Sequence, residues 1–165
     1  MTQRKSRILI VEDDENIRRT MENILQQKGY ETDTAKTGQE AEKKAKAHFY
    51  NLALLDIKLP DMKGTQLLAK LNGIAPKMLK IMVTGYPSLE NAMEALNQGA
   101  NAYVTKLVKP EKLLALIKEK LEEQSQAEKM TENKVTDWIK TRARHNWKTK
   151  TRKHIIKSTS TKGKH

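Results

Sequence analysis

The stretch Leu52–Asp56, LALLD, is four apolar residues that end in a carboxylate, and the chain then turns away through Ile57–Asp61, IKLPD. A near-continuous apolar run of this kind is typical of a strand that is buried on both faces of a parallel sheet. An ionised aspartate is rarely buried unless it is paired, and it is a poor strand former. Asp56 therefore either marks only where the strand leaves the core or is placed there for chemistry.

Similar short runs lie on both sides of this stretch. The predicted strands are Arg7–Val11, Glu31–Ala35, Leu52–Asp56, Lys80–Thr84 and Ala102–Thr105. The second run is more polar than the others, so we expect it near an edge of the sheet. We see no internal sequence repeat.

A helical pattern follows each predicted strand, around residues 17–25, 38–47, 67–71, 89–96 and 113–121. Thr37, Ser88 and Pro110 are suited to helix starts, and Gly29, Gly73 and Gly99 are placed to end helices. The repeated strand-then-helix order predicts an α/β fold, in which a parallel sheet has helices on both faces and right-handed crossovers.

The charge of the chain is unevenly distributed. The net charge is +12, but residues 1–125 hold 20 Lys and Arg against 17 Asp and Glu, whereas residues 126–165 hold 12 against 3. The absence of cysteine excludes disulfides and thiolate metal sites. No apolar run reaches the ~20 residues of a membrane span, and the first residues lack a signal-peptide pattern. We therefore expect a cytoplasmic protein with a domain over residues 5–123 and a basic tail over 124–165.

Polar side chains collect where the predicted strands end. In open α/β sheets, ligands bind outside the carboxyl ends of the strands. Each residue has an ordinary interpretation of its own: Asp14 caps a helix, Thr84 is a strand residue, and Lys106 is an exposed lysine. Their shared position nevertheless predicts one site at one edge of the sheet, made of Glu12, Asp13, Asp14, Asp56, Thr84 and Lys106.

The chemistry of this set favours phosphoryl transfer. Glu12, Asp13 and Asp56 would form a hard oxygen site that suits Mg²⁺. The four histidines lie at a helix end and in the tail, so a hydrolytic triad is disfavoured. A carboxylate can itself attack phosphorus, while a metal, a lysine and a hydroxyl hold the phosphoryl oxygens.

Four motifs carry a resemblance to a known family. The segments ILIVEDDE, LALLDIKLPDMKG, IMVTGY and ANAYVTK resemble the receiver domain of two-component response regulators, over about residues 5–123. The resemblance implies a flavodoxin-like fold, with a five-stranded sheet in the order 2-1-3-4-5, five helices, and here a basic helical or disordered C-terminal extension.

The resemblance also implies roles for individual residues. Asp56 matches the phosphoacceptor, and Glu12 and Asp13 match the acidic pair that handles Mg²⁺, with Asp13 the more direct ligand. Lys58 matches the position whose backbone carbonyl completes the metal site. Self-phosphorylation and autodephosphorylation at Asp56 are the only catalytic activities that we expect.

Three positions at the fourth and fifth strands match the family's switch. Thr84 matches the hydroxyl that contacts the phosphoryl group, Lys106 the lysine that pairs with it, and Tyr103 the aromatic whose rotamer follows phosphorylation. The family usually has a proline joined by a cis peptide after the lysine, but here Leu107 follows. A cis bond before leucine costs ~3–4 kcal/mol, so Lys106–Leu107 is either a strained cis bond or trans in a rearranged loop.

The function that follows is a two-component response regulator. A histidine kinase or phosphotransfer protein would phosphorylate Asp56, and the surface of the fourth helix, fifth strand and last helix would then act on a downstream effector or on a second copy. The alternatives are an interaction module uncoupled from phosphorylation and a DNA-binding regulator that acts through the tail.

The tail combines basic residues with a few apolar ones. Val135, Trp138, Ile139, Ala143 and Trp147 are spaced to share one face of a basic helix, and residues 148–165 have the composition of a disordered segment. Such a tail could contact nucleic acid phosphates weakly and without sequence preference, contact an anionic membrane surface, or simply be solvated.

Overall fold

The computed structural model describes the backbone of residues 4–159 and the side chains of residues 4–145. The chain divides into two compact units, Met1–Leu121 and Glu122–His165. The first unit contains the sheet and the helices that cover it.

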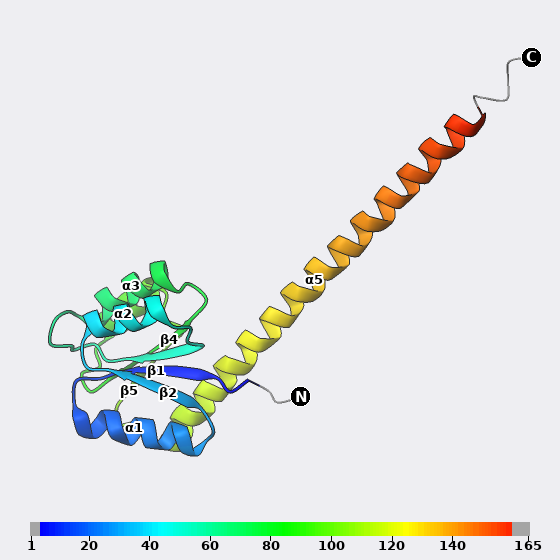
Figure 1. Ribbon diagram of the computed structural model, residues 1–165. Coiled ribbons are helices and arrows are strands. Elements are labelled where there is room, and N and C mark those ends of the chain that lie inside the picture. The colour runs from blue at the N-terminus through cyan, green and yellow to red at the C-terminus, as the bar shows by residue number, and fades with distance from the viewer. Residues whose placement is uncertain (1–3, 160–165) are drawn as a thin grey trace, which may run out of the picture. The chain divides into compact units, whose positions relative to one another are not determined.

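The five predicted strands are present and form one parallel sheet (Figure 1). The sheet order is β2-β1-β3-β4-β5, which confirms the predicted topology. The third strand ends one residue before Asp56, so this carboxylate stands just outside the sheet. The strands are β1 (Arg7–Val11), β2 (Glu31–Ala35), β3 (Leu52–Leu55), β4 (Leu79–Thr84) and β5 (Ala102–Thr105).

Five helices follow the strands in alternation, as the sequence predicts. Thr37 and Ser88 cap α2 and α4 by accepting hydrogen bonds from backbone N–H groups. Gly29 and Gly99 have φ of +88° and +92°, a conformation that glycine adopts without strain. The helices are α1 (Glu15–Gln27), α2 (Gly38–Ala47), α3 (Gly64–Ile74), α4 (Leu89–Asn97) and α5 (Pro110–Thr159).

The core has two layers because successive side chains of a strand point to opposite faces. Leu9 and Val11 of β1 pack in the layer that contains α2 and α3, and Ile8 and Ile10 pack in the layer that contains Leu25 of α1 and the start of α5. Figure 1 shows α2 and α3 on one side of the sheet and α1 on the other. Burial on both faces explains why β3 and most of β1 and β4 are continuously apolar.

The helix α5 continues through the basic segment as far as Thr159. The expected disorder from Lys148 is therefore wrong for residues 148–159, while residues 160–165 and the side chain of Trp147 lie outside the described part. The sequence has neither glycine nor proline between residues 111 and 159, and lysine and arginine are good helix formers. Among the helices of the described residues, none combines the length and hydropathy that a membrane crossing requires.

Candidate functional site

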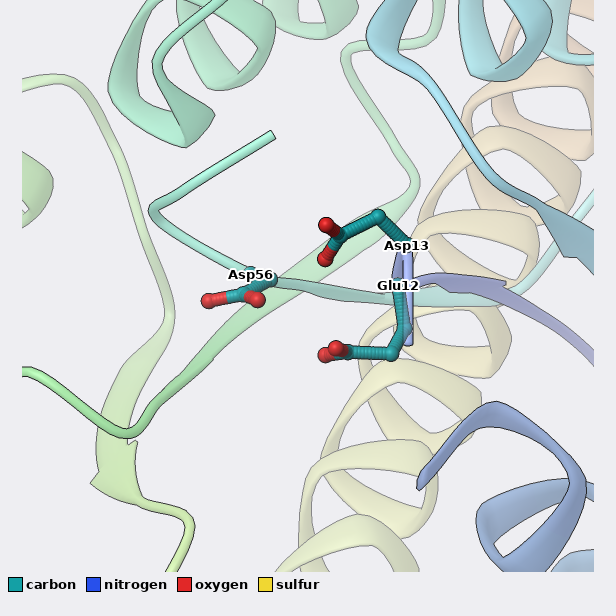
Figure 2. Close-up of side chains that lie close together, drawn as sticks. All are labelled: Glu12, Asp13 and Asp56. Atoms are coloured by element: carbon teal, nitrogen blue, oxygen red, sulfur yellow. The ribbon is translucent and has the colours of Figure 1, made fainter. Parts of the chain in front are cut away.

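Three carboxylates from two strand ends meet at the carboxyl edge of the sheet. Glu12 and Asp13 follow β1, Asp56 follows β3, and one oxygen of each lies within 4.8 Å of the others (Figure 2). Glu12 and Asp56 are 2% and 4% exposed, whereas Asp13 is open to solvent. The structure thus brings together the three carboxylates that the sequence predicts as metal ligands.

The backbone of this edge continues the ladder of the sheet. The N–H of Glu12 donates to the carbonyl of Ala35 at 3.0 Å, and that of Asp56 donates to the carbonyl of Val11 at 3.1 Å. These hydrogen bonds fix the backbone positions of Glu12 and Asp56 at the ends of their strands. Asp14 caps α1 by accepting from the N–H of Ile17, so its ordinary interpretation is confirmed.

Arg18 of α1 supports the acidic loop, and the sequence reasoning missed it. The side chain is buried, and its Nη1 donates to the carbonyls of Glu12 at 3.0 Å and Asp13 at 3.2 Å. One sequence signal points to this role: Arg18 lies seven residues before Leu25, so a charged residue stands on the buried face of the helix.

Gly64 is the second supporting residue that sequence reasoning did not assign. A Cβ added to Gly64 would lie 2.0 Å from the backbone oxygen of Asp56, so no larger residue fits without moving the loop. The N–H of Gly64 also donates to the carbonyl of Ile57 at 2.6 Å. This close approach fixes the main chain that follows the Asp56 side chain, at the Asp56 carbonyl and at Ile57.

Lys106 reaches the acidic cluster although no proline follows it. Its Nζ lies 2.8 Å from Oε2 of Glu12 and 2.9 Å from Oδ2 of Asp56. The described residues contain no cis peptide bond, so Lys106–Leu107 is trans, the second of the two expected alternatives. The backbone N–H of Lys106 donates to the carbonyl of Thr84 at 2.8 Å, which anchors the lysine while the Leu107 side chain remains 93% exposed.

The electrostatics of the cluster follow from its burial. Burial raises the pKa of Glu12 to about 7, and the neighbouring Asp56 charge also raises it, while the hydrogen bond from Lys106 opposes the shift. Burial would lower the pKa of Lys106, but the hydrogen bonds to Glu12 and Asp56 outweigh it and the pKa is raised. Lys106 is therefore a charged ammonium that donates to both carboxyl groups.

The remaining predicted residues lie around the same edge. Thr84 is fully buried, and its Oγ1 accepts a hydrogen bond from the N–H of Tyr86 at 3.0 Å. Tyr103 of β5 is half-buried, and its hydroxyl accepts from the N–H of Ser88, the cap of α4, at 3.4 Å. Thr84 and Tyr103 are thus each linked to the loop that leads into α4.

Lys58 lies on the loop after β3. Its N–H approaches Oδ1 of Asp56 at 3.4 Å, and its ammonium stands 3.7 Å from the centre of the Tyr86 ring. The side chain is exposed and points to an aromatic ring instead of the carboxylates, which agrees with a role for its backbone only. Tyr86 is a neighbour of the site that no sequence signal identified.

The donor set of the cluster matches a hard divalent cation. Glu12, Asp13 and Asp56 offer oxygen ligands alone, the type that Mg²⁺ and Ca²⁺ prefer over the nitrogen and sulfur ligands of zinc sites. The lysine that spans two of these carboxylates gives the cluster a fixed positive charge beside the Asp56 oxygen. Together these groups can bind a metal and stabilise a phosphoryl group.

Known proteins resemble this chain in sequence and in fold. The family model described as the response regulator receiver domain matches residues 8–118. Among curated proteins, "Response regulator ArlR" of Staphylococcus aureus (strain Mu50) is 33% identical over 131 residues, which cover 79% of this chain and 59% of the relative. The chain thus spans about three fifths of the length of the curated relatives it matches.

Solved structures agree with the family match. A response regulator receiver domain protein (CheY-like) from Methanospirillum hungatei is 52% identical, with a TM-score of 0.74 over 75% of this chain and 99% of its own. A response regulator from Burkholderia pseudomallei, solved with a phosphorylated aspartic acid and a calcium ion, is 30% identical, with a TM-score of 0.66 over 78% of this chain and 75% of its own. This chain belongs to the response regulator receiver domains of two-component systems.

Proposed function

We propose that Asp56 accepts a phosphoryl group from a histidine kinase or phosphotransfer protein, with Mg²⁺ bound by Glu12, Asp13 and Asp56. The observation that carries the proposal is the meeting of these carboxylates within 4.8 Å, with Lys106 Nζ 2.9 Å from Asp56. The phosphorylated aspartic acid and the calcium ion of the Burkholderia relative support both parts of this assignment.

The residues would act as follows. An oxygen of Asp56 attacks phosphorus, the P–N bond of the donor phosphohistidine breaks, and an aspartyl phosphate forms. The bound cation would neutralise negative charge on the phosphoryl group. Lys106, already beside Asp56, would pair with a phosphoryl oxygen, and the Thr84 hydroxyl would donate a hydrogen bond to another. The carbonyl of Lys58 is the proposed additional metal ligand.

The conformational change that follows phosphorylation would pass through the loop after β4. Movement of Thr84 toward the phosphoryl group would break its hydrogen bond from Tyr86, and Tyr103 would change its contact with Ser88 at the start of α4. Apolar side chains on α4 are exposed at helical spacing: Leu89 is 78% exposed, Met93 56% and Leu96 57%. Such a stripe with β5 and the start of α5 would receive an effector or a second copy.

The first experiment measures phosphorylation directly. Incubation with Mg²⁺ and a small phosphodonor should add one phosphoryl group that is labile to hydroxylamine, as followed by intact mass. Asp56→Asn should abolish the addition, whereas Asp14→Asn is a matched control at the same edge whose role is to cap α1. An unmodified wild type, or equal modification of Asp56→Asn, would contradict the proposal.

The interaction module uncoupled from phosphorylation is the weaker alternative. A loop rearranged by the missing proline would favour this alternative if it moved Lys106 away from the site, but Lys106 contacts both Glu12 and Asp56. The DNA-binding regulator is weaker as well, because the described tail is a single helix, whereas base-reading helices are usually supported by other elements.

A further inference from the structure

The part of α5 within the second unit exposes apolar side chains along one face. Val135 is 51% exposed, Trp138 57% and Ile139 55%. At 100° per residue these three positions and Arg142 fall within an arc of about 100°. The guanidinium of Arg142 lies 4.5 Å from the centre of the Trp138 ring. We call Val135, Trp138, Ile139 and Arg142 the tryptophan face.

The charge around this face is predominantly positive, and Asp137 is the one acidic residue of the sequence after Val135. From Trp138 to the end of the chain, the sequence holds ten Lys and Arg and no Asp or Glu. Lys134, Lys140 and Arg144 lie close to the tryptophan face in sequence and are exposed. A helix with an apolar, tryptophan-containing face and a basic remainder has the pattern of a helix that lies in the plane of a membrane interface.

Other occupants of the tryptophan face are less well matched. A second copy of the helix would bring two strongly basic segments together, which like charges oppose. A nucleic acid would satisfy the basic groups and could stack a base on Trp138, but it would leave Val135 and Ile139 uncovered. A lipid interface provides both phosphate groups and an apolar layer.

We propose that α5 beyond Lys134 binds the surface of a bilayer that contains anionic phospholipids. Val135, Trp138 and Ile139 enter the boundary between headgroups and acyl chains, and the basic residues pair with lipid phosphates. Arg142, stacked on Trp138, pairs with a lipid phosphate directly above the Trp138 ring, which lies in the bilayer interface. This attachment is separate from phosphorylation of Asp56.

The two tryptophans of the chain, Trp138 and Trp147, make the test direct, because the first unit contains none. The full chain is titrated at ~0.15 M salt, where exposed charges are largely screened, with vesicles of phosphatidylcholine alone or mixed with phosphatidylglycerol. We expect a blue shift of tryptophan emission and co-sedimentation only with the anionic vesicles. Asp56→Asn should bind these vesicles as the wild type does.

The tryptophan face is tested with a double variant and a matched control. Val135→Ser with Ile139→Ser should weaken binding to anionic vesicles about tenfold or more, because the apolar area that enters the interface is lost. Met130→Ser removes another exposed apolar side chain (60% exposed) that lies about 140° from Val135 around the helix, so it should leave binding unchanged.

Three results would overturn the proposal. The first is no binding to anionic vesicles at this salt concentration, and the second is equal binding of wild type and double variant. The third is that the full chain binds a DNA duplex more tightly than the vesicles and that the double variant binds the duplex as the wild type does. This result would assign the surface to nucleic acid. Circular dichroism of each variant shows whether the helix is retained.

Discussion

Two lysines at opposite ends of the sheet show how one residue type is used in two ways. At the carboxyl end, Lys106 spans Glu12 and Asp56, and these partners raise its pKa against the effect of burial. At the amino end, Lys80 is only 1% exposed and donates to the carbonyl of Ala75 at 2.8 Å, and burial lowers its pKa.

The difference teaches that burial alone does not identify a functional charge. Lys106 is surrounded by carboxylates, so its charge can stabilise an added anion. Lys80 donates to a backbone carbonyl, which satisfies one of its three protons without compensating the charge. The carboxyl end thus holds groups of opposite charge under support from Arg18 and Gly64, whereas the amino end holds a lysine that serves packing.

The largest expected effect contrasts the two ends of α3. Gly64→Ala, at the amino-terminal end of α3, should cost about 3 kcal/mol of unfolding free energy, because the new methyl group would collide with the Asp56 backbone. Gly73→Ala near the other end of the helix meets no atom within 4 Å and should stabilise by up to ~1 kcal/mol. Urea denaturation of both variants measures the difference, and equal midpoints would show that the loop moves aside.

The next effect separates the two lysines. Lys106→Met should lower the rate of Asp56 phosphorylation by a small phosphodonor about a hundredfold, because it removes a charged donor beside the reacting oxygen. Lys80→Met should leave this rate unchanged, since Lys80 lies at the far end of the sheet. The rate is followed by intact mass over time. A similar loss in both variants would mean that general destabilisation is responsible.

A smaller effect is expected from Arg18. Arg18→Gln removes the guanidinium that holds the carbonyls of Glu12 and Asp13, so Mg²⁺ affinity should fall about tenfold. Isothermal titration with Mg²⁺ measures the affinity, and Arg19→Gln is the matched control, because Arg19 pairs with Glu15 on the solvent-exposed side of α1. Unchanged affinity in Arg18→Gln would show that the loop keeps its shape without support.

The smallest effect is on stability at Lys80. Because its pKa is lowered in the folded state, the unfolded chain binds more protons, so folding becomes more favourable as the pH rises toward the ordinary lysine value of 10.5. Lys80→Met should remove this gain and change the stability at pH 7 by no more than ~1 kcal/mol. Denaturation of both proteins at pH 7 and above pH 9 provides the comparison, and parallel pH profiles would contradict it.

The strands, helix caps and site residues were predictable because their signals are local or depend on strand ends. An apolar run such as Ile8–Val11 and a cap such as Ser88 each act within a few residues. The meeting of Glu12, Asp56 and Lys106 followed from the rule that parallel strands end at one edge, even though 94 residues separate Glu12 from Lys106.

The missed features depend on contacts that no local pattern encodes. Position 64 needs glycine because the backbone of Asp56, eight residues earlier, leaves no room for a Cβ. Arg18 has its role because it donates to two carbonyls in the preceding loop. The position of Lys106 without a following proline depended on a hydrogen bond to Thr84 on the adjacent strand. The residues between Lys148 and Thr159 are helical although their composition is typical of disorder, because this segment contains no helix breaker.

The contact between Gly64 and the Asp56 backbone also makes one part of the sheet edge more rigid than the other. The loops after β1 and β3 are stiff, since Arg18 clamps one and the Gly64 packing clamps the other. We infer that the loops after β4 and β5 deform more easily, because Leu107 is exposed and the hydrogen bond from the Ser88 N–H to the Tyr103 hydroxyl is long, at 3.4 Å. A change at Asp56 would therefore leave the loops after β1 and β3 in place. It would displace the loops after β4 and β5, which lie on the side that leads to α4.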